Sequence, residues 1–80
     1  MTTITLDALG GGQWGQVAEV ATEPVMRRRL LDLGLVPGTT VSCTAVSPAG
    51  DPAAYLIRGA VIALRRRDAS CVRLAGAPWS

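Results

Sequence analysis

Apolar residues between positions 22 and 35 recur at the spacing of an α-helix. Met26, Leu30 and Leu33 stand at i, i+4 and i+7, which places them on one stripe of a helix. Arg28 and Asp32 lie off that stripe and face water. The pattern predicts one short amphipathic helix whose apolar stripe packs against a core.

Both ends of this helix carry recognisable signals. Thr22 or Glu23 is placed to cap the start, and Pro24 lies in the first turn, where a missing N–H costs nothing. Gly34 follows the last apolar turn as a left-handed residue, and Leu35 supplies the apolar contact that such ends favour.

The remaining segments alternate between apolar and polar residues and are separated by turn signals. In the clearest strand, Val41 and Cys43 alternate with Ser42 and Thr44. The predicted strands cover residues 15–20, 41–45, 53–58, 60–64 and 71–74. The turn signals are the Pro37–Gly38 pair of a type II turn, the cluster of Gly50, Asp51 and Pro52, and Gly59, which indicates a bulge or a tight reversal.

Short strands at this spacing with one helix favour a small barrel. We expect a mainly β fold of about five strands, with the short α-helix inserted after the first strand. We expect a single domain over residues 1–75. Residues 76–80 show no periodicity and are expected to form a flexible tail.

The composition limits the chemistry of the chain. Eighty residues suffice for one small domain, and the sequence contains no His and no Lys, so the usual general bases are absent. The six acidic residues are scattered, and the triple glycine 10–12 precedes a predicted strand instead of opening a helix. We therefore expect no enzyme, no catalytic residue and no cofactor.

Metal and membrane chemistry are disfavoured in the same way. Cys43 and Cys71 are the only cysteines and form no CxxC motif, so we expect a buried, reduced pair and no dedicated metal site. The longest uncharged stretch, 33–50, contains two prolines and cannot be a spanning helix. The N-terminus lacks the features of a signal peptide, and we expect a cytoplasmic protein without direct membrane insertion.

Arginine clusters are the main candidates for binding. Six of the eight cationic residues fall in the triplets 27–29 and 65–67. We expect the second triplet, 65–67, to lie on a surface that faces water and to have no binding role. In the first, Arg27 and Arg28 flank Leu31, which lies off the core stripe, and basic residues around an outward apolar residue are typical of a docking surface. A net charge of +2 and scattered aromatic residues predict only weak nucleic-acid binding without sequence preference.

Two longer segments resemble the FeoA family, small accessory proteins of bacterial ferrous iron uptake. They are MRRRLLDLGLVPGTTV at 26–41 and SPAGDPAAYLIRGAVIALRR at 47–66. The resemblance extends in order over nearly the whole chain. It implies an SH3-like barrel and a partner, the membrane GTPase-permease FeoB, whose GTP-binding domain faces the cytosol. It also implies that the chain itself neither moves iron nor catalyses a reaction.

Position by position, the resemblance falls mostly on residues with structural explanations. Those of the helix, turns and hairpin are Leu30, Leu33, Pro37, Gly38, Gly50, Asp51, Pro52 and Gly59. Leu56 and Val61 depart from the family pattern, which shows charged residues there, so they add apolar surface and favour a homo-oligomer.

The working hypothesis is a non-catalytic protein that docks on the cytosolic domain of FeoB and is recruited by it to the inner face of the membrane. The candidate contacts are Arg27, Arg28, Leu31, Gly34 and Leu35. Two alternatives stay open. One is a metal-linked regulator related to the C-terminal domain of iron-dependent repressors, and the other is a small nucleic-acid-binding barrel.

Overall fold

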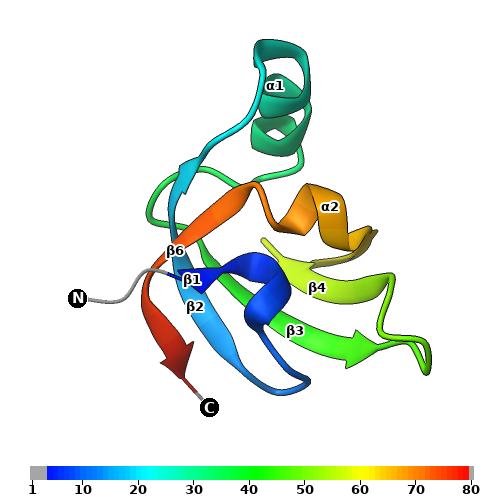
Figure 1. Ribbon diagram of the computed structural model, residues 1–80. Helices are drawn as coiled ribbons and strands as arrows, with labels where there is room; N and C mark the ends of the chain where they lie inside the picture. The colour runs from blue at the N-terminus through cyan, green and yellow to red at the C-terminus, as the bar shows by residue number, and fades with distance from the viewer. Residues whose placement is uncertain (1–3, 80) are drawn as a thin grey trace.

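Within residues 4–79, six antiparallel strands form a sheet in the order β1-β6-β2-β3-β4-β5 (Figure 1). The computed structural model describes residues 4–79, with main chain only at 76 and 77. The elements are β1 (Ile4–Thr5), η1 (Leu6–Ala8), β2 (Trp14–Val20), α1 (Pro24–Asp32), β3 (Thr40–Val46), β4 (Ala53–Ile57), β5 (Ala60–Leu64), α2 (Arg66–Ala69) and β6 (Val72–Trp79).

The sheet curls around a core supplied by alternate residues of each strand. In Figure 1, α1 stands beyond one end of the strands, and α2 lies beside β4. The inward residues are those that the alternation predicts, such as Val41 and Cys43 on β3 and Tyr55 and Ile57 on β4. The buried core comprises Leu6, Leu9, Val17, Val20, Leu30, Leu35, Val41, Cys43, Tyr55, Ile57, Leu64, Ala69, Val72 and Leu74.

This architecture confirms the mainly β fold and adds three short elements, β1, η1 and α2. The two-residue strand β1 precedes the strand that we expected to be first, so α1 follows β2 in the observed order. The helix α2 has only four residues, too few for an apolar period to appear in the sequence. The loop before β4 stabilises its first turn, because the backbone N–H of Arg66 donates to Asp51 Oδ1 at 2.9 Å.

Two turns follow their sequence signals. Thr39 N–H donates to the carbonyl of Val36 at 3.0 Å, and Gly38 has a φ of 91°, as the type II turn at Pro37–Gly38 requires. At the β4–β5 hairpin, Ile57 pairs with Ala60, so only Arg58 and Gly59 form the loop. Both have positive φ, 50° and 82°, which identifies the tight reversal and excludes the bulge.

The expected flexible tail at 76–80 is wrong as far as Trp79. Strand β6 continues to this residue, and Trp14 of β2 is its partner in the sheet. The two indole rings lie 4.9 Å apart between centroids at an angle of 37°. A large aromatic contact of this kind holds a strand end that has no periodic pattern. Ser80 lies outside the described residues.

The two cysteines lie in different environments. Cys43 is buried on the inner face of β3, whereas Cys71 is half-buried after α2, and both thiols are free. The expectation of a buried pair therefore holds for Cys43 alone. Burial raises the pKa of the Cys43 thiol above its ordinary value.

Candidate partner-binding site

Helix α1 is fixed at its first turn by the carboxylate of Glu23. This side chain accepts hydrogen bonds from the backbone N–H groups of Met26 at 2.6 Å and Val25 at 3.0 Å. Two of the N–H groups that every helix leaves unpaired at its start are thereby satisfied. The sequence left the cap open between Thr22 and Glu23, and the structure assigns it to Glu23.

The other end of α1 closes as the sequence predicts. Gly34 has a φ of 107°, and its N–H donates to the carbonyl of Leu31 at 2.9 Å, while Leu35 N–H donates to Leu30 at 3.2 Å. This pair of bonds is a Schellman motif, in which an apolar residue after the glycine packs back on the helix. Leu35 plays that part and has no exposed surface.

Three of the five candidate contacts are less exposed than we expected. Leu35 belongs to the core, and Gly34 is also buried, so neither presents a side chain to a partner. Leu31 is half-buried and packs against the core, and it is not the outward residue that we expected. The apolar stripe is wider than i, i+4 and i+7 indicated, because the helix rests on the sheet through Leu31 as well.

The exposed side of α1 carries the remaining candidates and one residue that the sequence reading missed. Arg27 and Arg28 are exposed, and Arg28 Nε lies 3.3 Å from Asp32 Oδ1 in an ion pair that is itself open to water. Val25 is 78% exposed and is the large apolar residue of this side. No local signal in the sequence distinguishes it from Leu31, which is also apolar and lies off the main stripe.

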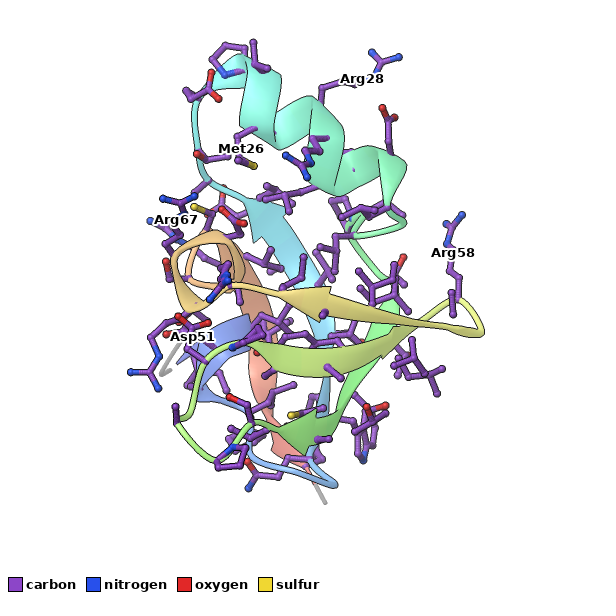
Figure 2. All side chains as sticks on the ribbon, turned by 90° about the vertical axis from the view of Figure 1, so that its right-hand side faces the viewer. Met26, Arg28, Asp51, Arg58 and Arg67 are labelled. Carbon is purple, nitrogen blue, oxygen red and sulfur yellow. The ribbon has the colours of Figure 1, made fainter. Side chains whose placement is uncertain are left out.

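We call the exposed residues Val25, Arg27, Arg28 and Arg29 the outer helix face. Val25, Arg28 and Arg29 share one side of the helix, and Arg27 points to another side. The β4–β5 hairpin extends the outer helix face, because its tip packs against the end of α1. An added Cβ at Gly34 would lie 3.1 Å from Ile57 Cγ2 and 3.2 Å from Arg58 Cδ. Figure 2 shows Arg28 and Arg58 pointing outward on the same side of the molecule, and Met26 pointing inward.

A separate cavity of about 220 Å³ lies on the other side, where Figure 2 shows Asp51 and Arg67. Tyr55, Asp7, Asp51 and Arg66 are among its lining residues. Within residues 4–79, no three side chains of the His, Cys, Asp or Glu type gather as a metal site would require. Burial, with the negative charges of Cys43, Asp7 and Asp51 as lesser causes, raises the pKa of Tyr55 to about 12.

This shift predicts a loss of stability at high pH. Between the ordinary pKa of 10.0 and about 12, the unfolded chain loses the phenol proton and the folded chain keeps it, so the folded state is disfavoured as pH rises. At about 1.4 kcal/mol per pKa unit, the free energy of unfolding falls by about 2–3 kcal/mol across this interval.

Denaturant unfolding measured from pH 8 to 12 tests the loss, with Tyr55→Phe as the matched variant, because Tyr55 is the only tyrosine. Between pH 10 and 12, we expect the free energy of unfolding of the variant to fall by about 2–3 kcal/mol less than that of the wild type. Parallel pH curves for the two proteins would contradict the assignment.

The fold and the exposed face together define a class of protein: a small antiparallel barrel of the SH3-like kind that presents a capped helix. The FeoA domain model matches residues 4–75, and the chain belongs to the FeoA family. No helix within residues 4–79 has the length and hydropathy needed to cross a bilayer.

A known fusion protein and several solved structures resemble the chain. It is 32% identical over 69 residues to the Fe(2+) transport protein A/Fe(2+) transporter FeoB fusion protein of Porphyromonas gingivalis. That match covers 86% of this chain but only 8% of the length of the fusion protein.

Among solved structures, the FeoA protein of Chlorobium tepidum is 36% identical with a TM-score of 0.81, covering 92% of this chain and 71% of that one. The zinc complex of Stenotrophomonas maltophilia FeoA, described as a prokaryotic SH3 domain protein, is 29% identical with a TM-score of 0.81. It covers 90% of this chain and 89% of that chain. A manganese-dependent transcriptional repressor with a TM-score of 0.83 is only 20% identical, so this likeness shows the fold alone.

Proposed function

We propose that this protein is a non-catalytic accessory protein of ferrous iron uptake that binds the cytosolic GTP-binding domain of a FeoB-like transporter. It acts in the cytoplasm, and its partner brings it to the inner face of the membrane. In this proposal the chain contributes a binding surface to the transporter, and the transporter supplies GTP hydrolysis and the iron pathway.

The observation that carries the proposal is the fusion protein of Porphyromonas gingivalis, whose name joins Fe(2+) transport protein A to FeoB. Fusion holds two domains at a high effective concentration, so a weak contact between them is populated most of the time. A separate chain has to reach the same contact through its own affinity. A dedicated surface for the transporter domain is therefore expected on this protein.

The outer helix face is the surface that we assign to this contact. It combines the exposed apolar side chain of Val25 with guanidinium groups, and arginine is enriched at the centres of protein interfaces. Arg27 and Arg29 make no ion pair within residues 4–79, so their charges are available to acidic groups of a partner. The rigid caps at both ends of α1 hold these side chains in place before binding.

Reversing one charge on this face separates binding from folding. Arg28 is exposed, and its ion pair with Asp32 is worth only about 0–1 kcal/mol, so Arg28→Glu changes the free energy of unfolding by less than about 1 kcal/mol. We expect the same change to weaken binding to the purified GTP-binding domain about tenfold or more. Calorimetric titration measures the affinity, and thermal melts measure the stability.

Arg67→Glu is the matched control. Arg67 lies on α2 on the opposite side of the molecule, and it faces a single neighbouring carboxylate, Asp68, at 4.0 Å (Figure 2). This variant should bind like the wild type. If Arg28→Glu binds with wild-type affinity, α1 is not part of the interface. If the wild-type chain does not bind, the GTP-binding domain is not its partner.

A further inference from the structure

Strand β5 is the last strand of the sheet, and β4 is its sole strand neighbour in the described part of the chain. Its second edge is open. In a hairpin with a two-residue loop, the residues that flank the loop exchange hydrogen bonds, and this pairing then recurs at every second residue. Ala60, Ile62 and Leu64 therefore bond to β4. Val61 and Ala63 turn their backbone N–H and C=O groups to the open edge.

This edge lacks the features that normally prevent strand addition. Natural edge strands are interrupted by lysine, proline, bulges or inward charges, or are covered by another element. The sequence of β5, AVIAL, contains none of these residues, and its register with β4 runs without a bulge from Ala60 to Leu64. Val61 is 64% exposed, and Ala60 and Ala63 are exposed as well, so no described element covers the strand.

Charge marks both ends of the open strand. Arg58 forms the turn before β5, and the triplet 65–67 follows its last residue; Figure 2 shows Arg58 and Arg67 at opposite ends of the hairpin. The ion pairs of the described residues leave Arg58 and Arg65 without a carboxylate partner. An apolar strand with a positive group at each end is complementary to an apolar segment with a negative group at each end.

The same charges disfavour a second copy of this chain as the occupant. If two copies of β5 paired antiparallel about Ile62, Arg65 of each would lie beside the Arg58–Gly59 turn of the other. In a parallel pair, Arg58 would face Arg58 and Arg65 would face Arg65. Like charges directly opposite each other destabilise strand pairs in both arrangements.

We propose that the open edge of β5 is a docking site for an extended segment of a partner protein, apolar in its centre and acidic at its ends, which adds to the sheet as a further strand. The backbone groups of Val61 and Ala63 pair with the segment, and Arg58 and Arg65 bind its acidic ends. On the outward face, Leu56 lies opposite Val61 in the register and provides an apolar contact for alternate side chains of the segment. The inference does not depend on the partner assigned to the outer helix face.

Labelled peptides test the site on the full chain by fluorescence anisotropy. The acidic probe is a short peptide of alternating valine and threonine with two glutamates at each end. One control probe has lysines at the ends, and another has a proline in the centre, which cannot pair along a strand. We expect the acidic probe to bind at least about tenfold more tightly than either control.

Two variants locate the binding on β5. Ala63→Pro removes an N–H that faces the open edge without removing a bond to β4, and we expect it to lower the affinity for the acidic probe about tenfold. The double variant Arg58→Glu/Arg65→Glu should reverse the preference, so that the lysine-ended probe binds more tightly. Arg73→Gln, on β6 and outside both proposed surfaces, should leave both affinities unchanged.

Amide hydrogen exchange gives a readout on the wild-type chain, which does not depend on how the variants fold. Bound acidic probe should slow exchange at Val61 and Ala63, and should leave Ile62, which already bonds to β4, unchanged. Equal binding of the three probes, or no slowing at Val61 and Ala63, would overturn the proposal. So would a dimer of the chain alone that Ala63→Pro dissociates, or tighter binding of anionic vesicles or an RNA oligomer than of the acidic probe at this edge.

Discussion

We expect Leu30→Ala to lower the free energy of unfolding by about 2–5 kcal/mol, the range measured when a fully buried leucine is truncated to alanine. Leu30 is 1% exposed and is the α1 residue that enters the core most deeply. The cavity cannot collapse readily, because both ends of the helix are fixed by hydrogen bonds of Glu23, Gly34 and Leu35. In a small domain this loss is a large share of the total stability of about 5–15 kcal/mol.

Thermal and denaturant unfolding measure this loss, with Val25→Ala as the control on the same helix. Val25 is almost fully exposed, so its truncation should change the free energy of unfolding by about 0.5 kcal/mol or less. Equal losses in the two variants would mean that α1 does not pack on the sheet through Leu30.

Gly34→Ala is expected to produce the second large effect. The φ of 107° is one that residues with a Cβ rarely adopt, and this strain costs about 1–3 kcal/mol. The added methyl would also lie 3.1 Å from Ile57 Cγ2, and overpacking of a core costs about 1–3 kcal/mol in addition. Both terms act at the contact between α1 and the β4–β5 hairpin.

Two other glycines separate these terms. Gly38 has a φ of 91° but open space around its Cβ position, so Gly38→Ala should show the backbone strain alone. Gly11 has neither a positive φ nor a neighbour within 4 Å, so Gly11→Ala should change stability by about 0.5 kcal/mol or less. If Gly34→Ala and Gly38→Ala lower the free energy of unfolding equally, the hairpin moves aside to accommodate the methyl group at position 34.

The sequence predicted those parts of the fold whose signals are local. The type II turn depends on Pro37 and Gly38, and the end of α1 depends on Gly34, so neighbouring residues suffice to specify each. The continuation of β6 to Trp79 was missed because it depends on a contact with Trp14, at the far end of the chain. Tertiary partners of this kind leave no periodicity in the strand itself.

The candidate site was predicted less completely than the fold, for a related reason. Arg27 and Arg28 could be assigned to the surface because they are charged, but Leu31 and Val25 are both apolar and lie off the main stripe. Which of them packs on the sheet depends on the direction from which the sheet meets the helix. That direction depends on strands that lie outside the helix in the chain, so the residues of α1 alone do not specify it.

The contact between Trp14 and Trp79 also gives this protein a built-in spectroscopic reporter. These are its only two tryptophans, and their rings meet where the start of β2 pairs with the end of β6. Intrinsic fluorescence therefore follows the joining of two segments from opposite ends of the sequence. Opening of the β2–β6 pair separates the two rings and is expected to change this signal.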